Sequence, residues 1–273
     1  MTFRERLSAA WTHSDSLLCV GLDPLPEKFP ASLQRADRPI LAFNQAIVDA
    51  TAPFACAYKP QFAHYAAANA LDDLRDTIAY IADRYPQKLV ILDSKRGDIG
   101  STAERYALEA FSVYGADAVT VNPYLGGDSL QPFLKHQERG VIVLCKTSNP
   151  GSGDFQNLDI GGGEKLFERV AKMAEQDWNA HDNVGLVVGA TYPEELARVR
   201  AIAPTLPILV PGVGAQGGDL EAVLKAGLND EGGLLINSSR GILYASNGPD
   251  FADAAAAEAR KIFDAIRRVR SAR

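Results

Sequence analysis

The chain of 273 residues contains eight short apolar runs of β-rich composition, and this recurrence restricts its possible folds more than any other feature. Because the runs are apolar on both faces, each is predicted to be a buried strand. Stretches of helical character lie between most of them, at 71–86, 101–115, 164–179 and 191–204. The predicted strands are 17–23, 54–60, 88–95, 118–124, 140–148, 184–191, 207–214 and 233–242.

Buried strands that alternate with amphipathic helices indicate an α/β fold with a parallel sheet, and eight such units fit a closed (β/α)8 TIM barrel. A doubly wound open sheet is the alternative, but no G-x-G-x-x-G motif follows the first strand. No linker or low-complexity segment divides the chain, so a single domain is expected over 1–273. The basic, amphipathic stretch 257–270 is predicted to be the last barrel helix rather than a membrane anchor.

The composition argues against several classes of partner. A net charge of −6 does not suit a surface for nucleic acid or for anionic membranes. The N-terminus lacks the apolar core of a signal peptide, and no run is long enough to span a bilayer, so a cytoplasmic protein is expected. Cys19, Cys56 and Cys145 lie in apolar runs and are expected to be buried and reduced.

Charged residues follow the predicted strands at the point where each strand ends. In the stretch 89–102, LVILDSKRGDIGST, a buried strand leads directly into a cluster of opposite charges. Asp23 ends the first predicted strand, Lys59 ends the second, and Asp93 and Lys95 end the third. Because side chains alternate along a strand, Asp93 and Lys95 should share a face. Active sites of TIM barrels form at these strand ends, so the four side chains are predicted to converge there.

The cluster could instead be a solvated turn with incidental ion pairs, which contribute little. Two lysines at matching depth after buried strands favour a functional array, because a buried lysine needs a counter-charge to stay protonated. Asp98 belongs to the array or begins a helix. Ser101 and Glu104 form a plausible capping box, which lowers the need for Asp98 as a cap.

A metal site is the other interpretation of these carboxylates. Asp23, Asp93 and Asp98 could coordinate Mg²⁺, but Lys59 and Lys95 would supply the positive charge that a metal brings. The histidines show no ligand spacing, and no C-x-x-C motif or serine-nucleophile elbow occurs. No metal is therefore expected.

The last two predicted strands carry a different signal. The glycine-rich stretch 211–219 follows the seventh strand, and the stretch 237–242 closes the eighth. Loops at these positions are the usual phosphate site of the fold, where Arg240 can offer a bidentate fork and Gln216 an amide donor. Glycines alone are weak support because they also serve tight turns.

The stretch 149–164 has no helical or strand pattern and is rich in glycine. Long segments of this kind are often functional, so we expect a lid that closes over a ligand. Ser148 and Asn149 at its root could bind a polar heterocycle, and Asn122 at the end of the fourth strand is expected to face the same cavity.

The stretch 90–102 matches the D-x-K-x-x-D-I-x-x-T signature and thereby resembles the orotidine 5′-phosphate decarboxylase family. The remaining layout agrees over nearly the whole chain, with VGLD at 20–23, Lys59 after the second strand and SSRGI at 238–242. The stretches 58–65 and 122–130 are similar to the longer bacterial branch of that family. The D-x-K-x-x-D motif alone is shared with sugar-phosphate decarboxylases. The resemblance therefore rests on all of these stretches taken together.

The resemblance implies cofactor-free decarboxylation of orotidine 5′-monophosphate to UMP and CO₂ in de novo pyrimidine biosynthesis. It also implies a homodimer with shared active sites, in which Asp98, Ile99 and Thr102 reach into the neighbouring site. The implied catalytic residues are Lys59, Asp93, Lys95 and Asp98. The implied substrate-binding residues are Asp23 and Lys59 at the ribose, Thr102 at a ribose hydroxyl, Ile99, Ser148 at the pyrimidine, and Gln216 and Arg240 at the phosphate.

Three other functions stay open on the sequence alone. A metal-dependent sugar-phosphate decarboxylase would lose activity with EDTA. A Schiff-base aldolase using Lys59 or Lys95 would be trapped by borohydride. A catalytically silent phosphate-binding barrel would bind nucleotide without turnover.

Overall fold

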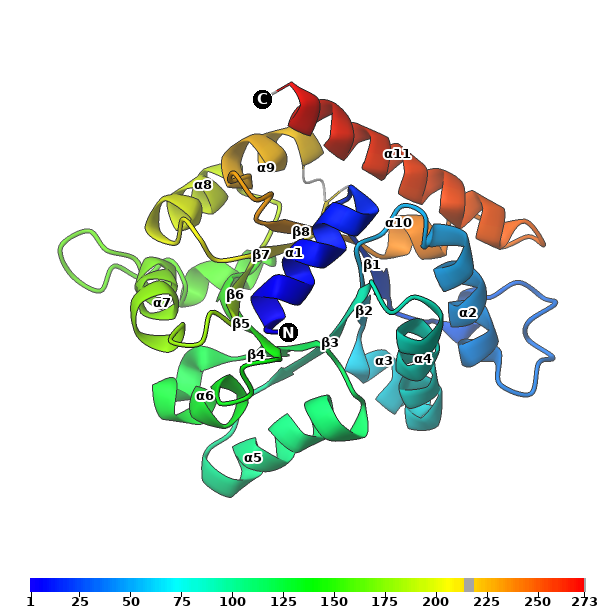
Figure 1. Ribbon diagram of the computed structural model, residues 1–273, viewed down its shortest axis with the longest axis horizontal. Coiled ribbons are helices and arrows are strands. Elements are labelled where there is room, and N and C mark those ends of the chain that lie inside the picture. Colours follow the sequence, from blue (N-terminus) through cyan, green and yellow to red (C-terminus); the bar gives the residue numbers. More distant parts are fainter. Residues whose placement is uncertain (214–218, 273) are drawn as a thin grey trace.

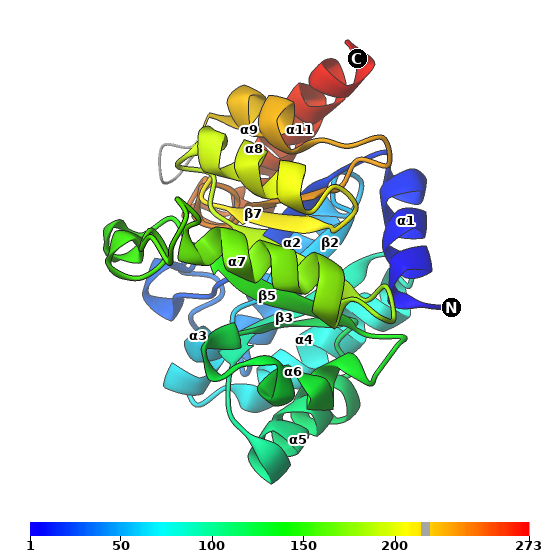
Figure 2. The ribbon, with the colours of Figure 1, turned by 90° about the vertical axis from the view of Figure 1, so that its left-hand side faces the viewer.

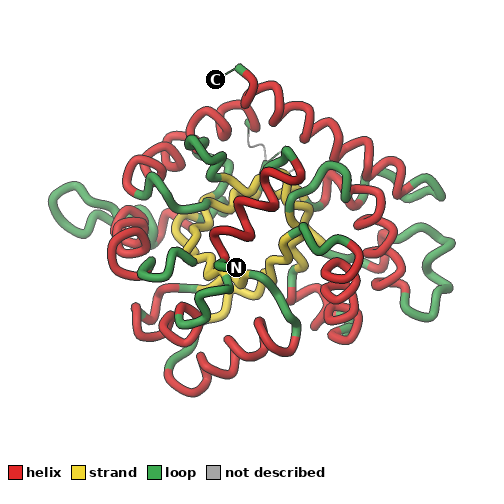
Figure 3. The backbone as a smooth tube through the Cα atoms, viewed as in Figure 1, coloured by secondary structure: helices red, strands yellow, loops and turns green. Residues whose placement is uncertain are grey.

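The computed structural model describes residues 1–213 and 219–272. In this part of the chain, eight parallel strands close into a barrel in sequence order, each hydrogen-bonded to the next and β8 to β1 (Figures 1 and 3). The TIM-barrel prediction is confirmed, and the open doubly wound sheet is excluded. The strands are β1 (Leu18–Leu22), β2 (Ala57–Pro60), β3 (Leu89–Arg96), β4 (Ala118–Val121), β5 (Gly140–Lys146), β6 (Val184–Val188), β7 (Ile208–Pro211) and β8 (Leu234–Ser238).

Helices surround the barrel on all sides (Figure 1). All four stretches predicted to be helical contain helices, and 257–270 lies in the terminal helix α11, which buries Phe251, Ala255 and Ala259. Two helices continue as π-helical turns, α5 through Glu109–Val113 and α7 through Ala174–Trp178. The helices are α1 (Phe3–Ser14), α2 (Pro39–Thr51), α3 (Phe62–Ala67), α4 (Leu71–Arg84), α5 (Gly100–Leu108), α6 (Gly127–Leu134), α7 (Leu166–Met173), α8 (Pro193–Ile202), α9 (Leu220–Gly227), α10 (Arg240–Leu243) and α11 (Phe251–Ser271).

Helix α1 covers the end of the barrel where the strands begin (Figure 1). Its residue Phe3 is buried, and a Cβ atom added to Gly140 at the start of β5 would lie 2.4 Å from the Phe3 ring. The absence of a side chain at Gly140 thus makes room for the Phe3 ring. In Figure 2, α1 lies at one end of the barrel and the segment 149–164 at the other. The carboxyl ends of the strands therefore lie at the end of the barrel opposite α1.

Several strands end earlier than the sequence predicted. Asn122 does not end β4 but follows it, where its side-chain oxygen accepts a hydrogen bond from the backbone N–H of Tyr124 and caps a 3₁₀ turn at Pro123–Leu125. Arg240 does not close β8 but opens the short helix α10. Local turns with their own hydrogen bonds replace the last strand residues in both places.

The segment 149–164 is more regular than its sequence suggests. It contains a 3₁₀ turn at Pro150–Asp154, and Asp159 pairs with Lys165 across its tip. Hydrogen bonds to the end of β5 anchor it: Lys146 Nζ donates to Ser152 Oγ at 2.7 Å, and the Gln156 side-chain oxygen accepts from the backbone N–H of Thr147 at 2.8 Å. The segment is thus tied to the end of β5.

The three cysteines are buried and unpaired, as predicted. Burial raises the pKa of all three thiols, that of Cys56 to about 12. Among the described helices, none combines the length and the apolar character needed to cross a membrane.

Candidate active site

Three charged side chains from β2 and β3 form a continuous array at the carboxyl end of the barrel. Lys59 Nζ donates to Asp93 Oδ2 at 2.7 Å, and Lys95 Nζ donates to Asp93 Oδ1 at 2.6 Å. Lys59 and Asp93 are buried, whereas the Lys95 side chain is 44% exposed. The predicted convergence of these three residues is confirmed, and Lys95 is the ammonium that an incoming ligand can reach.

A strand irregularity places Lys95 beside Asp93. The pairing of β3 with β4 shifts register between Leu92 and Arg96, and Lys95 has a left-handed backbone with φ of 46°. Thr120 on β4 holds the bulged chain: its hydroxyl donates to Asp93 Oδ1 at 2.9 Å and accepts from the Lys95 backbone N–H at 2.9 Å. Sequence reasoning missed Thr120, because it looks like any strand residue.

The array is electrostatically self-consistent. Burial alone would raise the pKa of the Asp93 carboxyl, but the charges of Lys59 and Lys95 outweigh burial and hold that pKa well below its usual range. Burial alone would lower the pKa of Lys59, but Asp93 and then Asp23 outweigh it and hold that pKa above its usual range. Lys59 and Asp93 are therefore fixed as ions before any ligand arrives.

Asp23 lies near Lys59 but is not bonded to it. Its charge helps Asp93 to hold the Lys59 pKa above its usual range, and its backbone carbonyl accepts a hydrogen bond from the Tyr244 hydroxyl at 2.8 Å. Within the described residues, Asp23 Oδ1 is buried and has no hydrogen-bond partner. A buried, unsatisfied acceptor at an active-site rim is suited to a ligand hydroxyl.

Strand β8 and the residue that follows it contribute two further polar side chains that sequence reasoning missed, Asn237 and Ser239. Asn237 Nδ2 lies 3.4 Å from Ser239 Oγ, and Asn237 Oδ1 is buried without a partner among the described residues. A Cβ atom added to Gly21 would lie 1.8 Å from Ser239 Oγ, so only glycine fits at this point of β1. The glycine in VGLD thus makes room for the end of β8 beside Asp23.

Asp98, Ile99 and Thr102 lie outside the array of their own chain. Asp98 Oδ1 accepts from the backbone N–H of Ile99 at 2.8 Å, and no contact within the described residues joins Asp98 to Lys59 or Lys95. Ile99 is 58% exposed, and Thr102 is also exposed. The structure brings none of the three to the cluster.

The predicted capping box at the start of α5 is wrong. The helix begins at Gly100 with Ile99 at the cap position, and no side chain caps it. Gly100 has φ of 53°, in the left-handed region that glycine reaches without strain. Because the helix already includes Ser101, that residue cannot be its N-cap.

The other predicted binding residues lie around the same end of the barrel. Ser148 follows β5 and packs against Gly189, where an added Cβ atom would lie 2.7 Å from that of Ser148. Asn122 packs on Gly97, and Arg240 is exposed in the first turn of α10. Gln216 lies outside the described residues.

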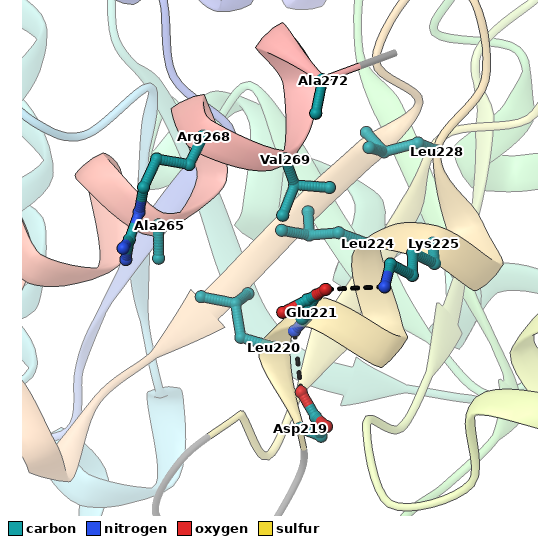
Figure 4. Close-up of a pocket in the computed structure, with 10 residues that line it drawn as sticks. All are labelled: Asp219, Leu220, Glu221, Leu224, Lys225, Leu228, Ala265, Arg268, Val269 and Ala272. Atoms are coloured by element: carbon teal, nitrogen blue, oxygen red, sulfur yellow. Dashed lines mark hydrogen bonds and ion pairs between the residues drawn. The ribbon is translucent and has the colours of Figure 1, made fainter.

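A separate groove lies between α9 and α11, on the outside of the barrel (Figure 4). Its apolar lining includes Leu224, Leu228 and Val269, and Lys225 at its edge is paired with Glu221 at 2.6 Å. None of the Lys–Asp array lines this groove, so it is not the candidate active site.

Asp23, Asp93 and Asp98 are the carboxylates that the sequence offers as ligands of a metal. Over residues 1–213 and 219–272, no group of three or more histidine, cysteine or acidic side chains is arranged to hold a metal ion. Both oxygens of Asp93 bind lysine ammonium groups instead.

The family model described as "Orotidine 5'-phosphate decarboxylase / HUMPS family" matches residues 16–256. The chain is 59% identical to the orotidine 5′-phosphate decarboxylase of Azoarcus sp. (strain BH72), with 97% of this chain and 98% of that protein covered.

Solved structures agree. The OMP decarboxylase of Leishmania donovani superimposes with a TM-score of 0.81 at 42% identity, covering 97% of this chain and 99% of that one. The UMP synthase of the same organism gives 0.84 at 45% identity, covering 98% of this chain and 57% of that longer one. The resemblance drawn from the 90–102 signature is confirmed, and the chain belongs to the orotidine 5′-phosphate decarboxylase / HUMPS family.

Proposed function

We propose that this chain decarboxylates orotidine 5′-monophosphate to UMP and CO₂, without a cofactor, as a step of de novo pyrimidine biosynthesis in the cytoplasm. The observation that carries the proposal is the Lys59–Asp93–Lys95 array, whose outermost ammonium is open to a ligand. Family membership and the similarity to named decarboxylases support the same reaction.

The chemistry explains why such an array is useful. When the bond between C6 and the carboxylate breaks, CO₂ leaves and the electron pair stays on C6 in the plane of the ring, where no neighbouring carbonyl delocalises it well. A fixed ammonium beside C6, supplied by Lys95, stabilises this carbanion. Lys95 then donates a proton to C6 to give UMP and regains one from water. Asp93 and Lys59 keep Lys95 in position, so no charge has to reorganise as the carbanion forms.

Each of the remaining polar groups suits a different part of the substrate. Asp23, with its unpartnered oxygen, and Lys59 suit the ribose hydroxyls. Ser148 at the end of β5 suits the pyrimidine edge, with Asn122 on the same rim. Arg240 and Gln216, after the last two strands, suit the 5′-phosphate, where this fold usually binds it. Binding energy from that remote phosphate would hold the substrate in place for reaction at C6.

We propose that the segment 149–164 is a lid over this site. Its root is tied to β5 through Lys146 and Ser152, whereas Phe155 near its middle is 61% exposed. An apolar side chain in that position would be covered on closure, and closure would exclude water from the carbanion. Limited proteolysis tests this: a saturating concentration of UMP should protect 149–164, and equal cleavage with and without UMP would contradict the lid.

We propose that the active enzyme is a homodimer with shared sites. Within the described residues, no contact joins Asp98 or Thr102 to the array of their own chain, and the exposed apolar residues Ile99, Tyr124 and Leu125 lie on the segments that follow β3 and β4. An exposed apolar patch of this kind marks an interaction surface. A two-fold partner covering it would receive Asp98, Ile99 and Thr102 in its own site and give its own in return.

Mixing two inactive variants tests the shared site. Asp98→Ala and Lys95→Ala chains should each be inactive alone. After mixing and exchange, a mixed dimer has one site with both residues intact, so activity should rise to about one quarter of wild type. Failure to recover activity, although sedimentation shows mixed dimers, would contradict shared sites.

The reaction itself is tested by incubating the purified protein with orotidine 5′-monophosphate in buffer containing EDTA and following the ultraviolet absorbance change. Turnover would establish the reaction and exclude an essential exchangeable metal. No turnover, with or without added Mg²⁺, would contradict the proposed function.

A further inference from the structure

The guanidinium of Arg96 is enclosed on the outer side of β3, next to the array but not in it. Its central carbon lies 4.3 Å from the ring centre of Phe62 and 4.5 Å from that of Tyr106. Its nitrogens donate to both carboxylate oxygens of Glu109 at 2.7–2.9 Å, and its side chain is 17% exposed. We call Arg96, Phe62, Tyr106 and Glu109 the Arg96 cage.

The cage joins three elements of the barrel wall. Phe62 begins α3, Tyr106 lies in α5, and Glu109 begins the π-helical turn that extends α5. Arginine between two aromatic faces and a bidentate carboxylate has little freedom, since stacking and the fork geometry both fix the guanidinium plane. π-Helical turns are rare and often occur at functional sites. The cage therefore fixes Arg96 rigidly to two helices.

Arg96 lies directly after the bulge that carries the array. Pairing of β3 with β4 stops at Leu92 and resumes at Arg96, whose carbonyl accepts from the backbone N–H of Asn122 at 2.7 Å. Between these points lies Lys95 in its left-handed conformation, which strains a non-glycine residue and persists only where its surroundings hold it. Thr120 holds the backbone of Lys95 itself, and Arg96 holds the chain immediately after it.

We propose that Arg96 is a positioning residue for the decarboxylation proposed above: the Arg96 cage locks the β3 bulge, and the bulge holds the Lys95 ammonium in its reactive position. Arg96 contacts neither Asp93 nor the open end of Lys95, so it acts through the backbone. This assigns a role to the one charge of the DSKRGD stretch that the reaction leaves unused.

Kinetics of Arg96→Met test the proposal first. A misplacement of the reacting group by about 1 Å can cost about 100-fold, so kcat should fall about 10- to 100-fold while KM changes less than about threefold. Arg96→Lys keeps the charge but loses the planar stacking and the bidentate fork, so its kcat should lie between those of wild type and Arg96→Met. In a Lys95→Ala background, adding Arg96→Met should produce no further loss, because the positioned group is gone.

Hydrogen exchange provides a measurement that does not need turnover. The Lys95 backbone N–H is bonded to Thr120 within the bulge, so exchange in the peptide covering 93–99 should be faster in Arg96→Met than in wild type.

Arg200→Met is the matched control. Arg200 is also buried, and its guanidinium donates to five backbone carbonyls, including those of Leu206 and Gly233 just before β7 and β8, at the opposite end of the barrel. This variant should lower the melting temperature yet leave kcat and exchange in 93–99 unchanged.

The results separate the two hypotheses. If wild type fails to convert orotidine 5′-monophosphate, the proposed function fails, and hydrogen exchange alone decides the role of the cage. If Arg96→Met loses thermal stability as Arg200→Met does but keeps wild-type kcat and exchange in 93–99, the cage is merely structural and the inference is overturned. A rise in KM alone would also overturn it. Should Arg96→Met fail to fold, Glu109→Gln, which weakens the same fork, replaces it with the same expected pattern.

Discussion

Thr120 binds the same Asp93 oxygen that Lys95 binds, and it does so from the neighbouring strand. The hydroxyl also accepts from the Lys95 backbone N–H, so one side chain fixes both the carboxylate and the lysine that it holds. A group with two such bonds is part of the positioning apparatus even though it carries no charge.

Thr120→Val should slow the reaction without changing the shape of the core. The substitution removes both hydrogen bonds of the Thr120 hydroxyl, a loss of about 1–2 kcal/mol that corresponds to about 5- to 30-fold in kcat. Thr120→Ser keeps the hydroxyl and is the matched control. Steady-state kinetics would contradict the role of Thr120 if the valine and serine variants had equal kcat.

The fold and the three central charges could be predicted because they rest on local rules. Strand and helix periodicity specified the barrel, and parallel strands must bring their carboxyl ends to one face. Lys59 and Asp93 therefore had to meet. The alternation rule also placed Lys95 with Asp93, but the structure reaches this arrangement through a bulge and a left-handed residue.

What the sequence did not reveal depends on contacts between distant elements. Thr120 meets Asp93 across 27 positions, and the Arg96 cage needs a π-helical turn that no periodicity indicates. The Ser101 capping box failed because the helix begins at Gly100, one residue before the predicted cap. In each case a tertiary contact or a backbone conformation outweighed the local pattern.

Lys95→Ala should abolish turnover while leaving UMP binding intact. The variant lacks the ammonium that would stabilise the carbanion and protonate C6, but the groups proposed for ribose and phosphate remain. Stopped assays with high enzyme concentration and calorimetry with UMP measure the two properties. Lys261→Ala, which removes an exposed lysine paired with Glu258 on α11, should match wild type in both. Turnover near wild type in Lys95→Ala would disprove the assigned role.

The buried pair of Asp93 and Lys59 should make a defined contribution to the pH dependence of stability. The pKa of Asp93 is held below its usual 3.8, so its ionised form stabilises the fold above that pH, and the contribution is lost as pH falls towards the folded-state pKa. The pKa of Lys59 is held above its usual 10.5, so its contribution is present below that pH and is lost as pH rises through the folded-state pKa.

Chemical unfolding at several pH values, on wild type and on the double variant Lys59→Met with Asp93→Asn, measures this contribution. The free energy of unfolding of wild type minus that of the double variant should be constant from about pH 5 to about pH 9. Below and above that window the difference should decrease, because wild type loses the contribution of the ionised pair. A difference that changes steadily through neutral pH would mean that the pair is not locked as ions.

Arg240→Ala should raise KM much more than it lowers kcat. The guanidinium is assigned to a phosphate far from the reacting carbon, and a charge-assisted hydrogen bond contributes about 1.5–3 kcal/mol, so KM should rise about 10- to 100-fold. Arg240→Lys keeps the charge but not the bidentate fork, so its KM should lie between those of wild type and Arg240→Ala. The same variants should bind uridine, which has no phosphate, as wild type does. An unchanged KM for orotidine 5′-monophosphate, or an equal loss of uridine binding, would remove Arg240 from the phosphate site.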